Sequence, residues 1–348
     1  MKAVARPLTM GLGLVAVLGL TLLVFRLPVL DSMKLLADGA FGDRFAWSRT
    51  AVKAAPLLMT GLGMVVAWRA GMYNIGGEGQ FIVGGLFGAT LAKVAVIGAQ
   101  HVPGWVGSLG ILVASAIGGA CWAWLSAWLF VRRGVAVVIS TILLNFVALQ
   151  LLGYCVSGPL QEQKRQVPLT ESLPDAVMLP RPSPQMDLHL GVLLPLIAAV
   201  LVFVYLYRTR AGYRLRLVGE NPDMARANRI DAGKVQVQAM LVSGALCGLA
   251  GGIEYVGIAG QLGADFSQQW GFLGIPVALL GGLHPLICIV SATVFGALFS
   301  GSDNLARFTT AGATLIYVIQ AVAVLGYVGI KAYTDGRKWE GDSGSDGV

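Results

Sequence analysis

The length of the uncharged apolar runs limits what this chain can fold into more than any other feature. Two runs, Val94–Val131 and Phe266–Ser302, contain no Asp, Glu, Lys or Arg. A helix crosses the hydrocarbon core of a bilayer with about 20 residues, so each run must fold back or hold parts of two helices. Gly and Pro cluster where such a turn is needed, at residues 101–104 and at residues 281–285.

The composition agrees with a membrane protein. Charged residues make up 12% of the chain, whereas an average soluble domain has about 25%. Backbone groups in lipid must be satisfied internally, and these long continuous runs lack the alternation of a membrane β-barrel. The sequence therefore predicts an all-α polytopic bundle of about ten spanning helices, within a range of about eight to ten. We expect them at residues 8–25, 52–68, 78–98, 105–131, 135–157, 189–207, 235–257, 270–283, 285–301 and 311–331.

The charges of the loops predict the orientation of the chain. Residues 208–234 hold seven basic side chains against three acidic ones, and basic loops stay in the cytoplasm. Arg132-Arg133 and the basic residues after the last span fit the same side. Residues 158–189 are Pro-rich and slightly acidic, so we expect them outside. Both termini are then cytoplasmic.

Two further stretches complete the predicted organisation. Residues 27–50 lie outside on this topology, and their apolar side chains recur at roughly helical spacing among charges. This pattern favours an amphipathic surface helix, with a linker as the alternative. The polar tail, residues 333–348, is predicted to be disordered. Because no loop is long enough to hold a soluble domain, residues 1–332 are expected to form one transmembrane domain.

Several function classes are disfavoured by what the sequence lacks. The four cysteines and three histidines show no metal-ligand spacing, so we expect neither a disulfide framework nor a metal site. The net charge of +7 follows from basic cytoplasmic loops and does not imply nucleic acid. No P-loop, zinc-protease or serine-hydrolase motif occurs. The chain itself is expected to be neither an enzyme nor a cofactor-binding protein.

The segment GMYNIGGEGQ, residues 71–80, is unusually polar for its place between two apolar stretches. It carries Asn74, Glu78 and Gln80 together with four glycines. Polar groups at membrane depth usually face a cavity, and interrupted helices build transport sites near the midplane. The alternative is a loop tip at the cytoplasmic surface. The residues alone leave both interpretations open.

A second polar stretch is VVISTILLNF, which begins at Val137. Ser140, Thr141 and Asn145 lie within about one and a half helical turns. Such side chains often hydrogen-bond to neighbouring helices and hold them together, and lining a polar pathway is the alternative.

The stretch SGALCGLAGG places Gly244, Gly248 and Gly252 at intervals of four residues. This spacing predicts a face of small residues for close helix packing. Glu254 follows it. We expect this carboxylate at the outer membrane surface, with a place in a solute pathway as the alternative.

The basic loop contains a helix-start signal. Asn221 suits the N-cap position, Pro222 the first helical position and Asp223 the first turn. A short helix is therefore predicted at about residues 222–230. Topology needs basic residues but not this turn and helix, which favours a docking element for a partner protein.

Taken together, these stretches resemble one family. The segments RAGMYNIGGEGQ, VVISTILLNF, GENPDMARANRID, SGALCGLAGG and GFLGIPVALLGGLHP, spread over about residues 50–330, look like the permease subunits of ABC importers. The similar group includes the branched-chain amino acid, ribose and nucleoside permeases. The Asn-Ile-Gly-x-Glu-Gly-Gln form is most like the simple-sugar and nucleoside branch.

The resemblance implies a division of labour in the bacterial cytoplasmic membrane. A separate ATPase chain would use ATP, an extracytoplasmic binding protein or lipoprotein would deliver the solute, and a second permease chain would complete the pore. Nucleosides or simple sugars would cross by alternating access. Asn74, Glu78 and Gln80, with Ser140, Thr141 and Asn145, would lie at the pathway. Coupling to the ATPase would involve Arg216, Gly219, Glu220, Asn221, Pro222, Asp223 and Arg226.

Two departures from the family pattern are visible. Arg229 stands where the family usually has Gly, and Ala136-Val137 where it often has Asn-Glu. The second departure weakens the assignment to nucleosides. A rival hypothesis is an ion-coupled secondary transporter that works without an ATPase. Its ion sites would need Glu78 and Glu254.

Overall fold

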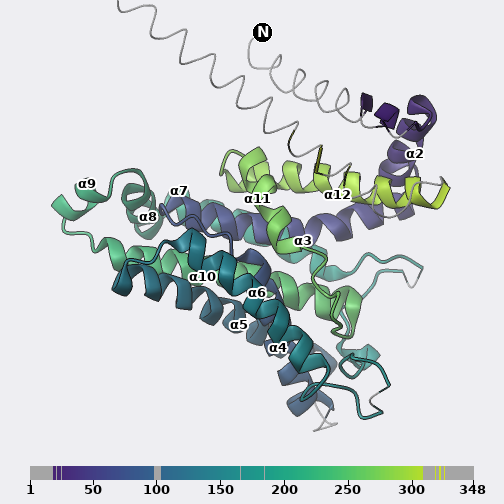
Figure 1. The fold of residues 1–348 in the computed structure, drawn as a ribbon, viewed down its shortest axis with the longest axis horizontal. Coiled ribbons are helices and arrows are strands. Elements are labelled where there is room, and N and C mark those ends of the chain that lie inside the picture. The colour runs from purple at the N-terminus through teal and green to yellow at the C-terminus, as the bar shows by residue number, and fades with distance from the viewer. Residues whose placement is uncertain are drawn as a thin grey trace, which may run out of the picture. The chain divides into compact units, whose positions relative to one another are not determined.

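The computed structural model describes residues 19–308, apart from residues 21, 25, 98–102, 165 and 184, and beyond them residues 318, 321, 322 and 325. Within that part of the chain the regular elements are helices, and one isolated β-bridge joins Gln161 and Thr170 (Figure 1).

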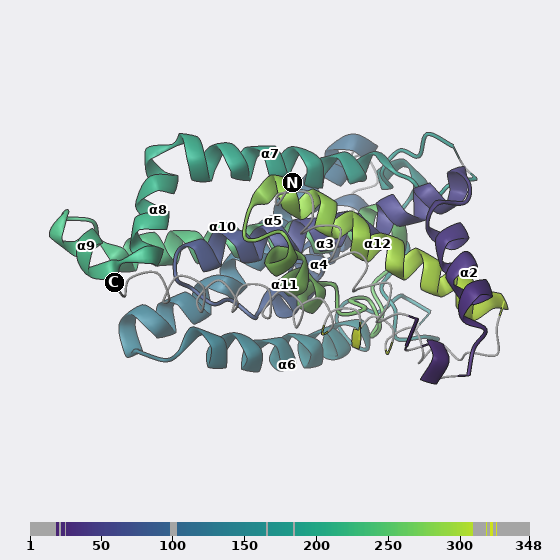
Figure 2. The same ribbon diagram turned by 90° about the horizontal axis from the view of Figure 1, so that it is seen from above.

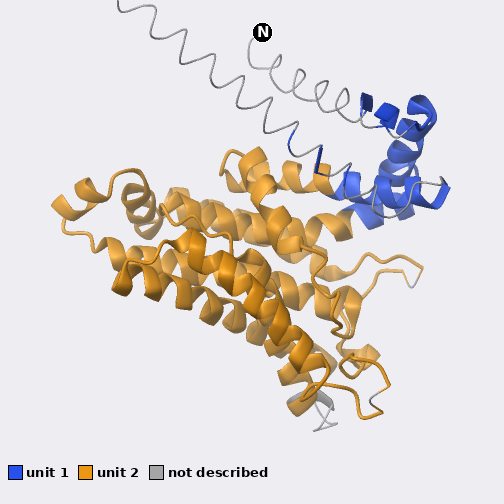
Figure 3. Cartoon of the chain, in the orientation of Figure 1, with its two compact units in different colours: residues 1–50, 296–348 blue, residues 51–295 orange. Residues whose placement is uncertain are grey.

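The chain forms two compact units (Figure 3). The larger unit is residues 51–295, and the smaller one combines residues 1–50 with residues 296–348. The boundaries fall inside two helices, α3 (Arg44–Arg69) and α12 (Pro285–Phe308), so each unit contains part of both.

The other helices of the larger unit follow one another along the chain. They are α4 (Gly77–Leu91) with the π-helical turn η1 (Ala92–Ile97), α5 (Gly104–Arg133), α6 (Val137–Val156), the 3₁₀ turns η2 (Asp175–Val177) and η3 (Leu190–Val192), α7 (Leu193–Arg208), α8 (Arg210–Glu220), α9 (Pro222–Ala227), α10 (Ala232–Glu254) with the π-helical turn η4 (Tyr255–Ala259), and α11 (Trp270–Leu280).

Helices that could cross a membrane account for most of the described chain. Six of them are long and apolar enough: α3, α5, α6, α7 with η3, α10 with η4, and α12, while α11 is apolar but shorter. Eight of the predicted spans coincide with these helices and with α4–η1. The predicted spans at residues 8–25 and 311–331 lie largely outside the described residues. The all-helical fold is thus confirmed, while the count of ten spans and the side of each terminus stay predictions.

Glycines bring α4, α5 and α10 into direct backbone contact at the centre of the larger unit. A methyl group at Gly119 of α5 would lie 2.2 Å from the carbonyl oxygen of Gly244 on α10. One at Gly248 would lie 2.3 Å from the carbonyl oxygen of Ser115. On α4, a methyl group at Gly84 would lie 2.4 Å from the Cα of Gly248. Only glycine permits this approach, which is how small residues pack helices in lipid. Figure 2 shows α6 and α7 running along opposite sides of α10.

In the smaller unit, α2 (Val29–Phe41) packs against the last turns of α12. Ser300 Oγ donates to the carbonyl oxygen of Gly39 at 2.7 Å, and Asn304 Nδ2 donates to that of Leu35 at 2.9 Å. A methyl group at Gly301 would lie 2.4 Å from the carbonyl oxygen of Leu36. These contacts bury the inner face of α2.

The amphipathic helix predicted in residues 27–50 is thus only partly correct. α2 ends at Phe41, and a new helix, α3, begins at Arg44. Asp43 Oδ1 accepts from the amide of Ala46 at 2.6 Å, as a helix-capping carboxylate does. Phe45 and Trp47 therefore belong to the first turn of α3 and not to a surface helix.

Candidate functional site

A mostly buried break separates α3 from α4 in the larger unit. Gly71 has φ +74°, the left-handed conformation that ends many helices. The amide of Met72 donates to the carbonyl oxygen of Ala67 at 3.0 Å and closes α3. The chain then runs without helical structure until α4 begins at Gly77. Such a break leaves backbone groups without helical partners, and side chains must satisfy them.

Asn74 is fully buried and fastens the break by four hydrogen bonds. Its Nδ2 donates to Gln80 Oε1 at 3.0 Å and to Ser243 Oγ at 2.9 Å. Its Oδ1 accepts from the amide of Gly76 at 2.8 Å and from Gln80 Nε2 at 3.1 Å. Asn74 and Gln80 thus form a reciprocal amide pair. The pair ties the break to the first turn of α4 and to α10.

α6 supplies the second set of bonds to the same segment. Asn145 Nδ2 donates to the carbonyl oxygen of Ile75 at 2.9 Å, and Asn145 Oδ1 accepts from the amide of Gly79 at 2.8 Å. The amide of Ile75 donates to Thr141 Oγ1 at 3.3 Å. One face of α6 therefore satisfies three backbone groups that the broken helix leaves without helical partners.

Glu78 joins α4 to α11. Its Oε2 accepts from the amide of Gly271 at 2.9 Å, and Ser267 Oγ donates to its Oε1. Gly271 lies in the first turn of α11, where a negative charge suits the helix dipole and the free amides. A methyl group at Gly271 would lie 2.2 Å from the nitrogen of Glu78. The carboxylate therefore caps a neighbouring helix whose backbone touches its own.

The structure brings five of the six predicted pathway residues together at this break. The sixth, Ser140, is buried, but its hydroxyl donates only within its own helix, to the carbonyl oxygen of Val137 at 3.1 Å. Ser243, Ser267 and Gly271 complete the site and were missed by sequence reasoning. Ser243 and Gly271 open two of the quoted stretches, SGALCGLAGG and GFLGIPVALLGGLHP, but neither stretch by itself indicates a contact with residues 71–80. Ser267 lies outside every quoted stretch, and nothing local identifies it. Whether any of these residues touches a solute stays a prediction.

The basic loop folds as two short helices, where one was predicted. Asn221 caps α9, since its Oδ1 accepts from the amides of Asp223 at 3.1 Å and Met224 at 2.9 Å. α9 ends at Ala227, before the predicted end. Ahead of it, α8 begins after Thr209, whose Oγ1 accepts from the amide of Gly212 at 3.0 Å. α8 was not predicted because its Arg residues were interpreted only as the positive charge of a cytoplasmic loop.

Gly219 of α8 lies directly against the turn that follows α3. A methyl group there would lie 2.2 Å from the carbonyl oxygen of Arg69 and 2.9 Å from the amide nitrogen of Gly71. Ordinary contacts of a methyl carbon begin at about 3.4 Å. The basic loop thus touches the chain only a few residues before Asn74.

The side chain of Arg69 connects the same turn to the α11–α12 turn. Arg69 Nε donates to the carbonyl oxygen of Leu283 at 3.1 Å, and Leu283 has a positive φ of 54°. The next residue, His284, stacks on Tyr207 at the end of α7, with ring centroids 5.4 Å apart. The guanidinium of Arg216 on α8 lies 4.9 Å from the centroid of the Tyr207 ring. Two chains of contacts therefore join α8 to the α11–α12 turn. One runs through Gly219 and Arg69, and the other through Arg216 and Tyr207.

The long loop of residues 158–189 covers the other end of α10. The amide of Leu179 donates to the carbonyl oxygen of Val256 at 2.8 Å, and Arg181 Nη2 donates to that of Gly257 at 3.1 Å. His189 is buried against Gly257, where a methyl group would lie 2.4 Å from the imidazole. Burial, with a smaller effect from the charge of Arg181, lowers the pKa of His189 to about 4.

Within the described residues, no group of three or more His, Cys, Asp and Glu side chains is arranged to hold a metal ion. The site is instead a set of amides, hydroxyls and one carboxylate that bond to backbone groups and to one another at a helix break. Interrupted helices held by polar side chains in this way are a recurring feature of membrane-transport proteins.

Comparison with known proteins identifies the family. Residues 47–326 match the family described as the permease component of branched-chain amino acid transport systems, and the chain belongs to it. It is 30% identical over 334 residues to the glucose ABC transporter permease protein TsgB13 of Haloferax volcanii, covering 93% of this chain and 86% of that protein.

Two further relatives are described as nucleoside permeases. The chain is 30% identical over 314 residues to the guanosine ABC transporter permease protein NupP of Bacillus subtilis, covering 88% of this chain and 87% of that protein. It is 26% identical over 276 residues to the nucleoside ABC transporter permease protein NupB of Lactococcus lactis, covering 76% and 74%. No solved structure matches the chain. The resemblance seen in the motifs is confirmed, and the chain is a transport permease subunit.

Proposed function

We propose that this chain is the membrane-spanning subunit of an ATP-driven importer of nucleosides or simple sugars. The family and the relatives support an ABC permease, and the relatives' printed substrates are glucose, guanosine and nucleosides. Glucose and guanosine are neutral polar molecules, so a neutral polar solute is the class that we propose for this chain. The chain would sit in the cytoplasmic membrane and alternate between inward-open and outward-open packings.

The observation that carries the proposal is the backbone contact of Gly219 with Arg69 and Gly71. α8 and α9 form the element that would bind the ATPase. Because α8 lies against the α3–α4 break without any side chain between them, a displacement of α8 must displace the break or open a gap. The break in turn is fastened to α6, α10 and α11 through Asn145, Asn74 and Glu78.

The substitution Gly219→Ala tests this coupling. Its methyl group would need the α8 backbone to withdraw by about 1 Å from Arg69, although alanine is otherwise better than glycine in a helix by about 1 kcal/mol. Gly153→Ala on α6 is the matched control, since nothing lies within 4 Å of the added methyl group. In proteoliposomes with the ATPase, Gly219→Ala should hydrolyse ATP with reduced uptake, and Gly153→Ala should transport normally. Equal uptake by the two variants would show that movement of α8 is not transmitted to the α3–α4 break through this contact.

The docking role of α8–α9 has its own test. Glu220 and Asn221 replaced together by Ala would remove the cap of α9 and a charge beside it, and leave the membrane helices unchanged. The variant should insert normally and lose ATP-dependent uptake. Normal ATP-driven uptake would contradict the assignment of this loop to the ATPase.

The partners follow from the proposed function. We expect an ABC ATPase, a second permease chain and an extracytoplasmic binding protein or lipoprotein. A mild-detergent pull-down of the tagged chain with mass spectrometry should recover the ATPase with a second, different permease. Recovery of the ATPase alone would favour a homodimer.

The hydrogen bonds of Glu78 argue against the secondary-transporter hypothesis, which would use this carboxylate as an ion ligand. Glu78 is fully engaged with Ser267 and Gly271, so an ion would have to displace a helix cap. Uptake by the purified chain alone in liposomes, driven by an ion gradient without ATP, would nevertheless establish that mechanism. Uptake of labelled guanosine, uridine and glucose by the complete transporter distinguishes the solutes.

A further inference from the structure

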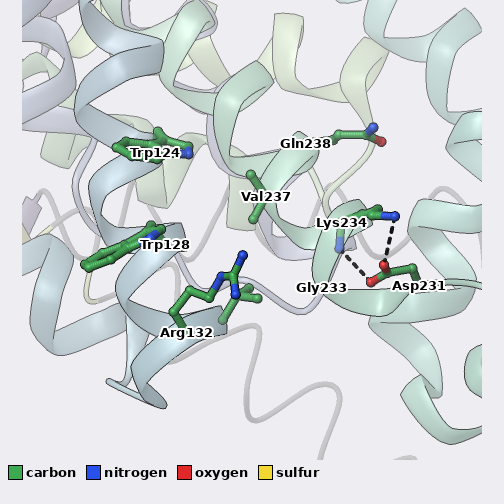
Figure 4. A pocket seen from close by; sticks show the side chains of 9 residues that line it. Trp124, Trp128, Arg132, Asp231, Gly233, Lys234, Val237 and Gln238 are labelled. Carbon is green, nitrogen blue, oxygen red and sulfur yellow. Dashed lines mark hydrogen bonds and ion pairs between the residues drawn. The ribbon is translucent and has the colours of Figure 1, made fainter.

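An open pocket of about 720 Å³ lies where the end of α5 meets the beginning of α10 (Figure 4). Its lining combines aromatic, apolar and charged side chains from these two helices and the residue that caps α10. The residues used below are Trp124, Trp128, Arg132, Asp231, Lys234 and Val237. None of them belongs to the α3–α4 break, so the pocket is a separate feature of the same unit.

The α5 wall is a single stripe of side chains. Trp124, Trp128 and Arg132 are spaced by four residues, which places them on one face of a helix. The two indole rings lie 6.4 Å apart between centroids. Eight residues of helix measure about 12 Å, so over that distance the stripe passes from a broad aromatic surface to a guanidinium, as expected where a membrane helix enters the bilayer interface. Tryptophan is enriched at that depth of membrane helices.

The charge of the lining is unbalanced. Lys234 Nζ lies 3.4 Å from Asp231 Oδ2, and Asp231 Oδ1 also accepts from the amide of Lys234 at 3.0 Å. These two side chains neutralise each other. Arg132 forms no hydrogen bond or ion pair with any residue that the structure describes. The pocket therefore presents one unmatched positive charge at its polar end, beside a second cation.

We propose that this pocket binds one anionic phospholipid, with its phosphate at Arg132 and its glycerol and acyl chains along Trp124, Trp128 and Val237. A guanidinium binds phosphate oxygens in a two-pronged geometry that ammonium groups lack. A soluble anion would gain nothing from the aromatic and apolar wall. A zwitterionic lipid would bring its own cation next to Arg132 and Lys234.

The location of the pocket agrees with this ligand. The pocket lies at the end of α10 that directly follows α9, next to the basic loop that is predicted to face the cytoplasm. Basic pockets between membrane helices on that side recognise anionic headgroups. None of the pocket residues is among those assigned above to the solute pathway or to the coupling.

Arg133 provides a matched control, since it has the same charge, adjoins Arg132 and does not line the pocket. The full chain, alone and in its purified complex, would be exchanged into micelles containing phosphatidylglycerol or phosphatidylcholine, and retained lipid counted by native mass spectrometry. Wild type and Arg133→Gln should retain one phosphatidylglycerol in preference to phosphatidylcholine. Arg132→Gln should lower that preference about five-fold. Arg132→Lys should give an intermediate value, which keeps the test informative if Arg132→Gln folds poorly.

A second measurement follows the aromatic wall. Phosphatidylglycerol with brominated acyl chains should quench tryptophan fluorescence, and less so when Trp124 and Trp128 are both replaced by Phe. The proposal would be overturned if Arg132→Gln and Arg133→Gln lost phosphatidylglycerol equally, or if neither variant lost it. Competition by inorganic phosphate at equal potency would indicate a soluble anion. Lipid retained by the isolated chain and absent from the complex would make the pocket a protein interface.

Discussion

The fully buried Asn74 offers the sharpest test of whether the helix break is a structural fastening or a solute-binding surface. Asn74→Ala removes four hydrogen bonds. It leaves the amide of Gly76 and the side-chain amide of Gln80 without partners in a buried site. Each such group costs about 1–3 kcal/mol, so the free energy of unfolding should fall by about 4 kcal/mol. Ser140→Ala, which removes one bond within α6, should cost less than about 1 kcal/mol.

The assay is unfolding of the purified chain in mixed micelles with increasing denaturing detergent, followed by circular dichroism. A double-mutant cycle separates the loss of the hydrogen bonds between Asn74 and Gln80 from the effect of making each side chain smaller. Because Asn74 and Gln80 bond each other reciprocally, the variant Asn74→Ala/Gln80→Ala should be less destabilised than the sum of the single variants by at least about 1 kcal/mol.

Two results would refute this reasoning. Additive effects at Asn74 and Gln80 would show that the amide pair contributes nothing beyond each residue alone. Unchanged stability of Asn74→Ala with an altered solute affinity would instead show that Asn74 faces the transport pathway, as the sequence first suggested.

Two further predictions concern the ends of α10. Arg229 has φ +57°, a conformation that costs a residue with a side chain about 1 kcal/mol relative to glycine. Arg229→Gly should therefore raise the free energy of unfolding by about 1 kcal/mol. Asn228→Gly is the control, because Asn228 has a negative φ, and this substitution should lower the free energy of unfolding. The pKa of His189 is lowered from 6.5 to about 4, so the fold keeps its full stability above pH 6.5 and loses it as the pH falls toward 4, because only the unfolded chain binds the proton there. The midpoint of unfolding measured from pH 7.5 to 4.5 should therefore fall less steeply for His189→Gln than for wild type, and identical pH profiles would exclude His189 as the cause.

Much of the architecture could be read from the sequence because membrane helices obey a local rule. A segment of about 20 uncharged residues must be helical in lipid whatever surrounds it. α5, α6, α7 and α10 accordingly lie close to their predicted ranges. The N-cap of α9 was also visible, since Asn221 acts on amides two and three residues away. The family resemblance rested on the same kind of local evidence.

The tertiary structure decided what the polar residues do, because their partners are distant in sequence. Glu78 reads as a membrane carboxylate in need of a cation, yet its partners are a hydroxyl and an amide 189 and 193 residues away. Gly219 was predicted only as part of the coupling loop, yet it touches the backbone of Arg69. The sequence by itself determined where the long apolar helices form and which segments are polar. Only the packing of α4 against α6, α10 and α11 decided that these polar groups bond to one another, since hydrogen bonds between helices depend on which faces meet.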